Sequence, residues 1–520
     1  MKKERNSLIL IMTSFFLGIM LSACGSDSKS DASSDENNPT SSPTSTRSLN
    51  DIALRNIITL NNLTGNALKG RSISHIESAK AQLGMRLFFS KSLGGDRDVA
   101  CVTCHHPVLG GGDNLSLPVG VGAEYPNLLG EGRIHSSSAN HYDGGPTVPR
   151  NAPTTFNVAA WDKVFFQDGR LESLGKTVNA GGADGLGIRT PVMEFNVSDP
   201  MAGASLTIAQ TRFPIIAPQE MRGFSLNLTD KQQVRDYLAS RLGGFAAGAG
   251  ILANTDYWLQ QFRIAFMQPT ATAEEVITEQ NIAILLSEYE RSQAFTHSAW
   301  REYIEGNNQA ISEDAKQGGL IFFRTQKQGG ADCASCHQGD LFSDEAFHNI
   351  AMPQIGLGKN NGITLTSDFG RFRETKDEAD KYAFRTPSLL NIEVTGPWSH
   401  TGAYTSLKAV VQHHLNPQNA VNNYDINQLK QIGIQNLDKM KINTQAALDK
   451  LAFDRSLNKN VIQDITLSDQ QVNYLLKFLK TLTDPCVKDR ACLAKWIPPL
   501  NEDPNGDQLD AVDDVDATAL

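Results

Sequence analysis

The sequence contains Cys101-Val102-Thr103-Cys104-His105 near its start and Cys333-Ala334-Ser335-Cys336-His337 in its second half. A Cys-x-x-Cys pair alone is compatible with a redox disulfide or with half of a zinc site. Neither of these requires a histidine at the same offset behind both pairs. Attachment of a c-type haem requires all three residues, because two thiols bind the vinyl groups and the imidazole binds the iron. The stretches therefore predict two covalently bound haems, attached through Cys101, Cys104, His105, Cys333, Cys336 and His337.

The first residues indicate export. A basic start at residues 2–5 precedes an apolar run from Leu8 to Leu21, which is typical of a signal peptide and too short for a membrane span. Leu21-Ser22-Ala23-Cys24 then resembles a lipoprotein cleavage site. We therefore expect a signal peptide over residues 1–23 and a lipid on Cys24. An ordinary secretory signal with an incidental cysteine is the alternative.

Residues 25–50 are rich in Ser, Asp, Asn, Pro and Thr and lack apolar periodicity. Such a segment cannot bury enough surface to fold, so we expect a flexible tether over residues 24–70. The lipid would hold the protein on the periplasmic side or on the surface of the outer membrane.

The composition is that of a globular protein, with 40% hydrophobic and 20% charged residues and a formal net charge of −10. No basic stripe is present, so nucleic-acid binding has no electrostatic support. No later apolar run is long enough to span a bilayer.

Two cysteines remain near the end of the chain. Cys486 and Cys492 enclose a short loop, and in an oxidising compartment they predict a local disulfide that pins an acidic tail over residues 486–520. Within that tail, Asp503–Asp510 resembles a calcium-binding turn, although disorder is equally compatible with its composition.

Similar sequences precede the two Cys-x-x-Cys-His motifs. The stretch from Ala79 to Phe89 and the stretch from Ala315 to Phe323 both end in Phe-Phe and predict an amphipathic helix that delivers two aromatic rings to a haem. This duplication predicts a mainly α fold with long loops and little sheet. It would consist of two cytochrome c-like helical domains, residues 71–297 and 298–485, each around one haem. A capping box at Thr272 should start a helix that runs to Tyr289 and ends the first domain.

Further motifs extend the pattern. They are Pro149–Thr154 with Phe156-Asn157, Asp168-Gly169-Arg170, Phe347–Ile350, Phe384–Asn391 and Thr395–Gly402. With these motifs, the chain resembles the bacterial di-haem cytochrome c peroxidases and their relative MauG from about residue 72 to about residue 485.

The resemblance implies that peroxide reacts at the N-terminal haem and that the C-terminal haem relays electrons. His105 would be the proximal ligand of the first iron and His337 that of the second. Glu220, which precedes Met221, matches a glutamate that helps to cleave the O–O bond. Burial in an apolar pocket would raise the pKa of such a carboxyl toward neutrality. A solvated loop carboxylate is the alternative for Glu220.

The sixth ligand of the second iron departs from the family patterns. Fourteen residues after His400, where classical peroxidases have methionine and MauG has tyrosine, this chain has His414. We therefore expect His337 and His414 to bind the second iron, with Met352 or Met440 as the alternatives. Imidazole in place of methionine lowers the reduction potential.

Two other positions differ from the family. Gln167 replaces a tryptophan between the haems, so a hopping route would need another group such as Trp161 or Trp398. The histidine that caps the resting first iron in many peroxidases is also missing. His135 and His141 lie in the following insertion, and we expect neither to bind, which leaves the first haem five-coordinate.

The resemblance also implies a calcium ion, held by the Asn151 side chain and the carbonyl oxygens of Thr395 and Pro397, since calcium prefers oxygen ligands. Three functions remain open. The first is a peroxidase that takes electrons from a small redox protein. The second is a MauG-like enzyme that oxidises residues of a partner protein, and the third is a membrane-tethered electron carrier without catalysis. A homodimer is common in the family.

Overall fold

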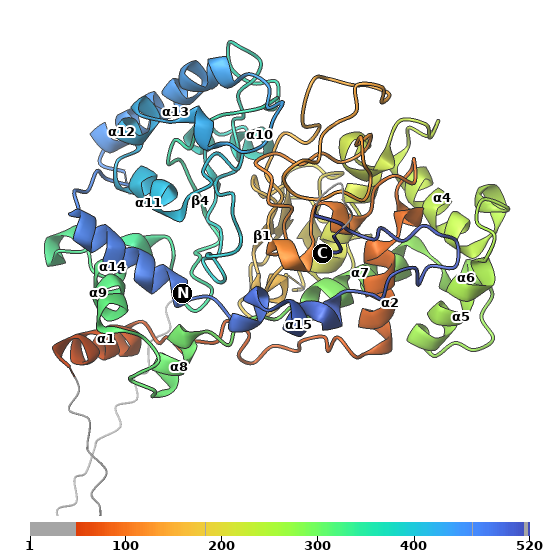
Figure 1. The fold of residues 1–520 in the computed structure, drawn as a ribbon, viewed down its shortest axis with the longest axis horizontal. Coiled ribbons are helices and arrows are strands. Elements are labelled where there is room, and N and C mark those ends of the chain that lie inside the picture. The colour runs from red at the N-terminus through yellow and green to blue at the C-terminus, as the bar shows by residue number, and fades with distance from the viewer. Residues whose placement is uncertain (1–47, 183, 460, 514–517) are drawn as a thin grey trace, which may run out of the picture. The chain divides into compact units, whose positions relative to one another are not determined.

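Helices and long irregular loops dominate the computed structural model, which describes residues 48–182, 184–459, 461–513 and 518–520 (Figure 1). Its helices are α1 (Leu49–Leu60), α2 (Ala79–Phe89), α3 (Leu206–Thr211), α4 (Lys231–Gly243), α5 (Thr255–Phe266), α6 (Ala273–Val276), α7 (Glu279–Ser292), α8 (Ala299–Glu305), α9 (Glu313–Phe323), α10 (Phe372–Thr375), α11 (Leu407–Leu415), α12 (Pro417–Asn422), α13 (Met440–Ser456), α14 (Asp469–Lys480) and α15 (Arg490–Leu493). The signal peptide and Cys24 lie outside the described residues. None of the helices in the described ranges is both long and apolar enough to cross a bilayer.

Two small antiparallel sheets make up the strand structure of the described residues. One contains β1 (Val164–Phe165), β2 (Leu171–Ser173) and β3 (Ile188–Arg189) in that order, and the other pairs β4 (Phe347–His348) with β5 (Phe384–Arg385). The register places Phe347 opposite Arg385. The prediction of a mainly α fold with little sheet is confirmed.

Each Cys-x-x-Cys-His motif follows a helix that is packed closely against a later helix. α2 crosses α7 at Gly84, where an added Cβ would lie 1.9 Å from the carbonyl oxygen of Leu285. α9 crosses α14 at Gly318, where an added Cβ would lie 1.9 Å from the carbonyl oxygen of Tyr474. Only glycine permits these approaches. The two predicted helices that end in Phe-Phe are therefore present, and each crosses a later helix at a glycine that contacts a backbone carbonyl oxygen.

Two apolar cores surround these helix pairs. The first core contains side chains from α2, α4, α5 and α7, and the second contains side chains from α8, α9 and α14. Figure 1 shows the helices of each core grouped together. The boundary near residue 298 stays a prediction, but the buried side chains before and after it fall mostly into different cores.

The tether prediction is wrong from Leu49 onward, because residues 49–60 form α1. Ser48 caps this helix, and Leu54 and Ile58 are buried in the second core. These two side chains lie four residues apart, so they occupy one helix face. The prediction failed because the serine-rich segment ends near residue 48 and the apolar face of α1 begins directly after it.

The chain end is also ordered where it is described. Cys486 and Cys492 form the predicted disulfide. Beyond it, Leu509 is completely buried in the first core, and the side chain of Asp507 accepts hydrogen bonds from Ser92 and Arg97. The acidic tail therefore packs against the loop that precedes Cys101.

The helix predicted from Thr272 to Tyr289 is interrupted. The capping box at Thr272 is present and starts α6, which ends at Val276. Thr278 then accepts a hydrogen bond from the backbone N–H of Asn281 and caps the separate helix α7. Apolar spacing cannot reveal such a break, because the buried face continues across it.

Candidate functional site

One cavity of 1080 Å³ contains both Cys-x-x-Cys-His motifs on its lining. Its volume exceeds the range of about 300–1000 Å³ that is usual for a single small-molecule pocket. Aromatic side chains and residues of the quoted family motifs, including Asn151, Arg170, Phe347 and His400, also line it. The structure thus brings segments that are hundreds of residues apart to one place.

The two motif histidines are oriented in the same way. Nδ1 of His105 is 3.2 Å from the carbonyl oxygen of Gly111, and Nδ1 of His337 is 3.1 Å from that of Phe342. A carbonyl only accepts, so each Nδ1 carries the proton and each Nε2 keeps a lone pair. Burial lowers the pKa of both rings, in His337 to about 4 with the help of nearby His414. Both imidazoles are therefore neutral and can bind a metal through Nε2.

His414 faces His337, with a distance of 6.2 Å between the ring centres. Its Nδ1 is 2.8 Å from the carbonyl oxygen of Val410 on the same helix, α11, and burial lowers its pKa. Two imidazoles that share one metal have ring centres about 6 Å apart, since each metal–nitrogen bond is about 2 Å long and each ring centre lies about 1 Å further away. The pair could therefore hold one iron between them.

His413 differs from its neighbour although both lie on α11. Its Nδ1 accepts a hydrogen bond from the hydroxyl of Tyr404 at 2.8 Å, and its Nε2 donates to the carbonyl oxygen of Ile350 at 2.8 Å. Both nitrogens are therefore engaged. The alternative ligands Met352 and Met440 are both buried in one cluster with Tyr404, and of the two only Met352 lines the cavity.

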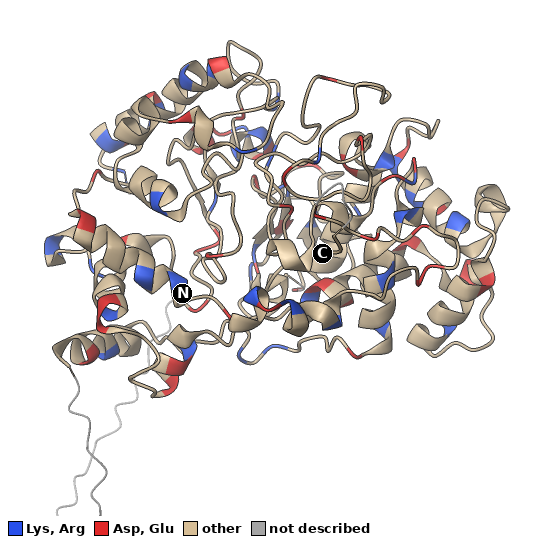
Figure 2. Ribbon diagram, viewed as in Figure 1, with Lys and Arg blue, Asp and Glu red and all other residues tan. Residues whose placement is uncertain are grey.

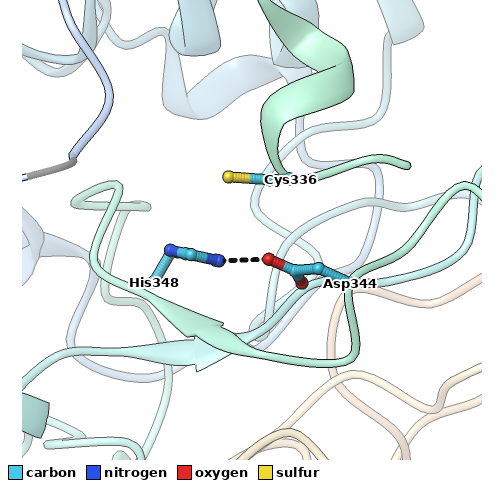
Figure 3. Close-up of side chains that lie close together, drawn as sticks. All are labelled: Cys336, Asp344 and His348. Carbon is cyan, nitrogen blue, oxygen red and sulfur yellow. Dashed lines mark hydrogen bonds and ion pairs between the residues drawn. The ribbon is translucent and has the colours of Figure 1, made fainter. Parts of the chain in front are cut away.

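Asp344 and His348 lie beside the second motif (Figure 3). The Nε2 atom of His348 is 2.7 Å from an oxygen of Asp344, and the Sγ atom of Cys336 completes a set of three potential metal ligands. Hydrogen bonding to Asp344 raises the pKa of His348 to about 10. Because Cys336 belongs to the second motif, we assign this group to the surroundings of that motif and not to a separate metal site.

A different set of groups faces the first motif. Glu220 lines the cavity together with Cys101, Cys104 and His105, and Sδ of Met221 is 3.9 Å from Sγ of Cys101. Burial raises the pKa of Glu220, against the opposing charges of Arg170 and Lys359. The first motif is therefore accompanied by a carboxyl group that holds a proton more readily than an ordinary glutamate does.

Glu220 sits on a π-helical turn, Pro218–Arg222. The N–H of Gly95 donates to the carbonyl oxygen of Met221 at 2.8 Å, and the hydroxyl of Thr147 donates to that of Gln219 at 3.3 Å. These contacts fix the turn to the loops on either side of Cys101–His105. Single π-type turns occur frequently at functional sites.

The cavity also contains polar groups that the sequence did not reveal. Gln210, Thr211 and Pro214, at the end of α3 and just after it, line the same cavity as Glu220. Glu290 of α7 lines it too, and burial raises its pKa to about 8. A single sequence gives no signal for these residues, because none of them belongs to a local motif.

The other residues singled out in the sequence are placed as follows. Trp161 and Trp398 both line the cavity. His135 packs against Tyr142, and His141 packs against Phe224; neither is among the lining residues. Of the described histidines, those that line the cavity are His105, His337, His348, His400 and His414.

Buried ion pairs join the two cores next to the cavity. Arg150 is 2.6 Å from Asp168 and 2.6 Å from Asp368, and Arg371 is 2.6 Å from Glu172. Although burial opposes it, the charge of Arg150 keeps the pKa of Asp168 below its usual value. Elsewhere, basic and acidic residues are interspersed (Figure 2). The Asp-Gly-Arg motif thus contributes to the junction between the cores.

The predicted calcium ligands all belong to the lining of the cavity. The backbone N–H of Asn151 donates to the carbonyl oxygen of His400 at 2.9 Å, and its side-chain nitrogen donates to that of Leu115 at 2.9 Å. Asn151, Thr395 and Pro397 all line the cavity. Since its amide nitrogen is engaged, the side-chain oxygen of Asn151 is the atom that could bind a cation.

The chain is similar to a family of known proteins. The family model "Di-haem cytochrome c peroxidase" matches residues 78–309. Methylamine utilization protein MauG of Methylorubrum extorquens is 29% identical over 336 residues, which cover 65% of this chain and 68% of the relative. Cytochrome c551 peroxidase of Pseudomonas aeruginosa is 25% identical over 345 residues, covering 66% and 73%. The chain is therefore similar to di-haem cytochrome c peroxidases and to MauG, and the family model matches residues 78–309 of it.

The match to a family model of di-haem cytochrome c peroxidases implies two c-type haems, in agreement with the two motifs. The fold agrees as well. The solved structure of a MauG-like protein associated with microbial copper homeostasis has a TM-score of 0.52 and 19% identity, and the match covers 82% of this chain and 97% of that one.

Proposed function

We propose that this di-haem protein is a c-type peroxidase, which reduces hydrogen peroxide at the first motif with electrons that arrive through the second. One peroxide then takes up two electrons and two protons and yields two water molecules. The observation that supports this most directly is the difference between the motifs. The carboxyl group of Glu220 accompanies Cys101–His105, whereas the imidazole of His414 faces His337.

Cys101, Cys104, Cys333 and Cys336 would attach the haems, and His105 would bind the first iron. When bound there, the haem supplies the iron that accepts the peroxide. Nδ1–H of His105 holds the ring against the carbonyl oxygen of Gly111, which fixes the direction of Nε2.

Glu220 would be the proton-transfer group. Cleavage of an O–O bond requires a group that removes a proton from one oxygen and delivers it to the other. Burial raises the pKa of Glu220 and makes its carboxylate a better base, while Arg170 and Lys359 limit the rise. A carboxyl group whose pKa is raised in this way is suited to accept a proton and then return it.

His337 and His414 would hold the second iron between two imidazoles. An iron held by both imidazoles would have no position left for peroxide, so the second motif would be suited to electron transfer alone. Asn151, Thr395 and Pro397 would bind a calcium ion at the junction. A lipid on Cys24 would tether the protein to the outer membrane, and a small periplasmic redox protein would be the electron donor.

Peroxide turnover by the purified di-haem protein, with a reduced small cytochrome as donor, tests the proposal. We expect donor oxidation to match peroxide consumption over many turnovers. A long-lived oxidised form without donor turnover would contradict it and indicate a MauG-like oxidant of a protein partner. If neither signal appears, the protein is an electron carrier.

A further inference from the structure

Arg385 occupies an unusual position at the junction of the two cores. It lies on β5, where its backbone N–H donates to the carbonyl oxygen of Gln167 at 2.9 Å. Its guanidinium carbon is 3.7 Å from the ring centre of Trp161, which belongs to the first core. Both side chains line the cavity, and only 8% of Arg385 is exposed.

The guanidinium of Arg385 has no polar partner among the described residues. Its Nε and Nη1 atoms are buried without a hydrogen bond, and no carboxylate of the described chain lies within ion-pair distance. Glu345 influences it only through space, and burial lowers the pKa of Arg385 to about 10. A buried charge without a partner is strongly destabilising.

The other buried arginines of the described chain are all satisfied to some degree. Arg133 donates to four backbone carbonyl groups, and Arg371 binds Glu172 and the carbonyl oxygen of Gly169. Arg150, Arg189, Arg212, Arg235 and Arg241 each donate at least one side-chain hydrogen bond. Arg385 is therefore the exception, and it is an exception that lines the cavity.

We propose that Arg385 binds a carboxylate side chain of a haem at the junction of the two cores, with the indole of Trp161 holding its guanidinium flat. The inference rests on the proposed attachment of two haems. Their carboxylates are the anions that this cavity would receive, and a planar guanidinium binds a carboxylate through two parallel hydrogen bonds. Neutral peroxide could not compensate the charge.

Two consequences follow from this pairing. Stacking on Trp161 uses one face of the guanidinium and leaves its N–H groups free to donate hydrogen bonds. Because Arg385 belongs to the second half of the chain and Trp161 to the first, a haem carboxylate bound there would fix the haem at a contact that both cores share. Trp161 would then act as a positioning residue and not as a necessary electron carrier.

Resonance Raman spectra and potentiometric titrations of the di-haem protein test the proposal. In R385Q we expect the propionate bending band of one haem to move and the midpoint potential of that haem to fall, because a positive charge that offset its carboxylate is gone. R385K, which keeps the charge but loses the planar edge, should move the same band by less. W161F should leave the charge in place and also move the band only slightly.

Arg371→Gln provides a matched control, since Arg371 is buried at the same junction but has Glu172 as its partner. It should leave both propionate bands in place. Unmoved bands and potentials in R385Q, with two haems attached, would overturn the proposal. If R385Q does not attach its haems, the propionate bending band of R385K becomes the test. A shifted band supports the proposal, and an unshifted band overturns it. The haem content per chain, measured separately, shows whether the proposed two-haem attachment itself has failed.

Discussion

The two Cys-x-x-Cys-His motifs share a scaffold but differ in what lies opposite the motif histidine. Both follow a helix that crosses a later helix at a glycine, and both orient their histidine through an Nδ1–carbonyl contact. At the second motif, a second imidazole, His414, closes the site. At the first, Glu220 and Met221 occupy the surroundings, and no second described histidine of that half lines the cavity.

Under the proposed function, this difference lets one fold serve two kinds of chemistry. The scaffold fixes the position of the attachment residues and leaves the opposite side free to vary. A neutral imidazole there would suit an iron that only passes electrons, and a carboxyl group of raised pKa would suit a site where protons move. The proposed role of each half then depends on a few residues that lie far from the motif in sequence.

Glu220→Gln should have the largest effect, because it removes the carboxyl group that distinguishes the first motif from the second. Loss of a positioned acid–base group typically costs about 10²- to 10⁴-fold in rate. We expect a fall of this size in the reaction with peroxide, measured by stopped-flow absorbance, with both haems still attached. In the unmodified protein the rate should also decrease as the pH drops below the raised pKa of Glu220, since the protonated group cannot accept a proton. A rate that is unchanged in the variant would exclude Glu220 from the reaction.

His414→Ala should open the second site. We expect the second haem to lose its low-spin electron paramagnetic resonance signal, because one of its two imidazoles is gone. His413→Ala is the control, since His413 is bound to Tyr404 and Ile350 instead. It should keep the low-spin signal while losing about 1–3 kcal/mol in the free energy of unfolding. A low-spin signal that survives in His414→Ala would point to another ligand, such as Met352.

Gly84→Ala and Gly318→Ala test whether the two scaffolds are equivalent. Each new methyl group would meet a backbone carbonyl oxygen at 1.9 Å, which the helices can avoid only by moving apart. Overpacking of this kind costs about 1–3 kcal/mol in the free energy of unfolding, measured with denaturant. Gly185→Ala, where an added Cβ meets nothing within 4 Å, is the control. If only one of the two variants is destabilised, the crossings are not equivalent.

Asp507→Asn should have the smallest effect and should act on the first core alone. The variant weakens the contact between the tail and Arg97, whose Nε is 2.9 Å from Oδ2 of Asp507. We expect a loss of about 1 kcal/mol in the free energy of unfolding. The exposed pair Lys477–Asp314 serves as the comparison, because removal of Asp314 from it should cost almost nothing. Equal losses in both variants would mean that the tail does not support the first core.

Local patterns in the sequence predicted local structure well. The spacing of Cys101, Cys104 and His105 marked an attachment site, and the apolar rows that end in Phe-Phe marked α2 and α9. The assignment of His414 as an iron ligand rested on a count of residues in a resembling family and stays a prediction, although the structure shows that His413 is engaged elsewhere. These predictions share a basis, since each depends on residues that are close in sequence or on a fixed interval.

The remaining features depend on contacts between distant segments, which a single sequence does not contain. Nothing near Leu49 shows that α1 has a core to pack against, and nothing near Arg385 shows that Trp161 will lie beneath it. The break at Ile277–Thr278 escaped for a related reason, because helix spacing continues through it. Gln210 and Glu290 could be recognised as site residues only from the structure, which shows that both line the cavity.

Each core contains a segment from the far end of the chain, so the two halves of the protein depend on each other for stability. α1, from the beginning of the described chain, completes the second core, and Leu509, from its end, completes the first. A gene cut between the two halves would yield two fragments, each lacking a piece that the other carries. Either half expressed alone should therefore be less stable than it is in the full chain, because its core lacks a segment that it normally buries.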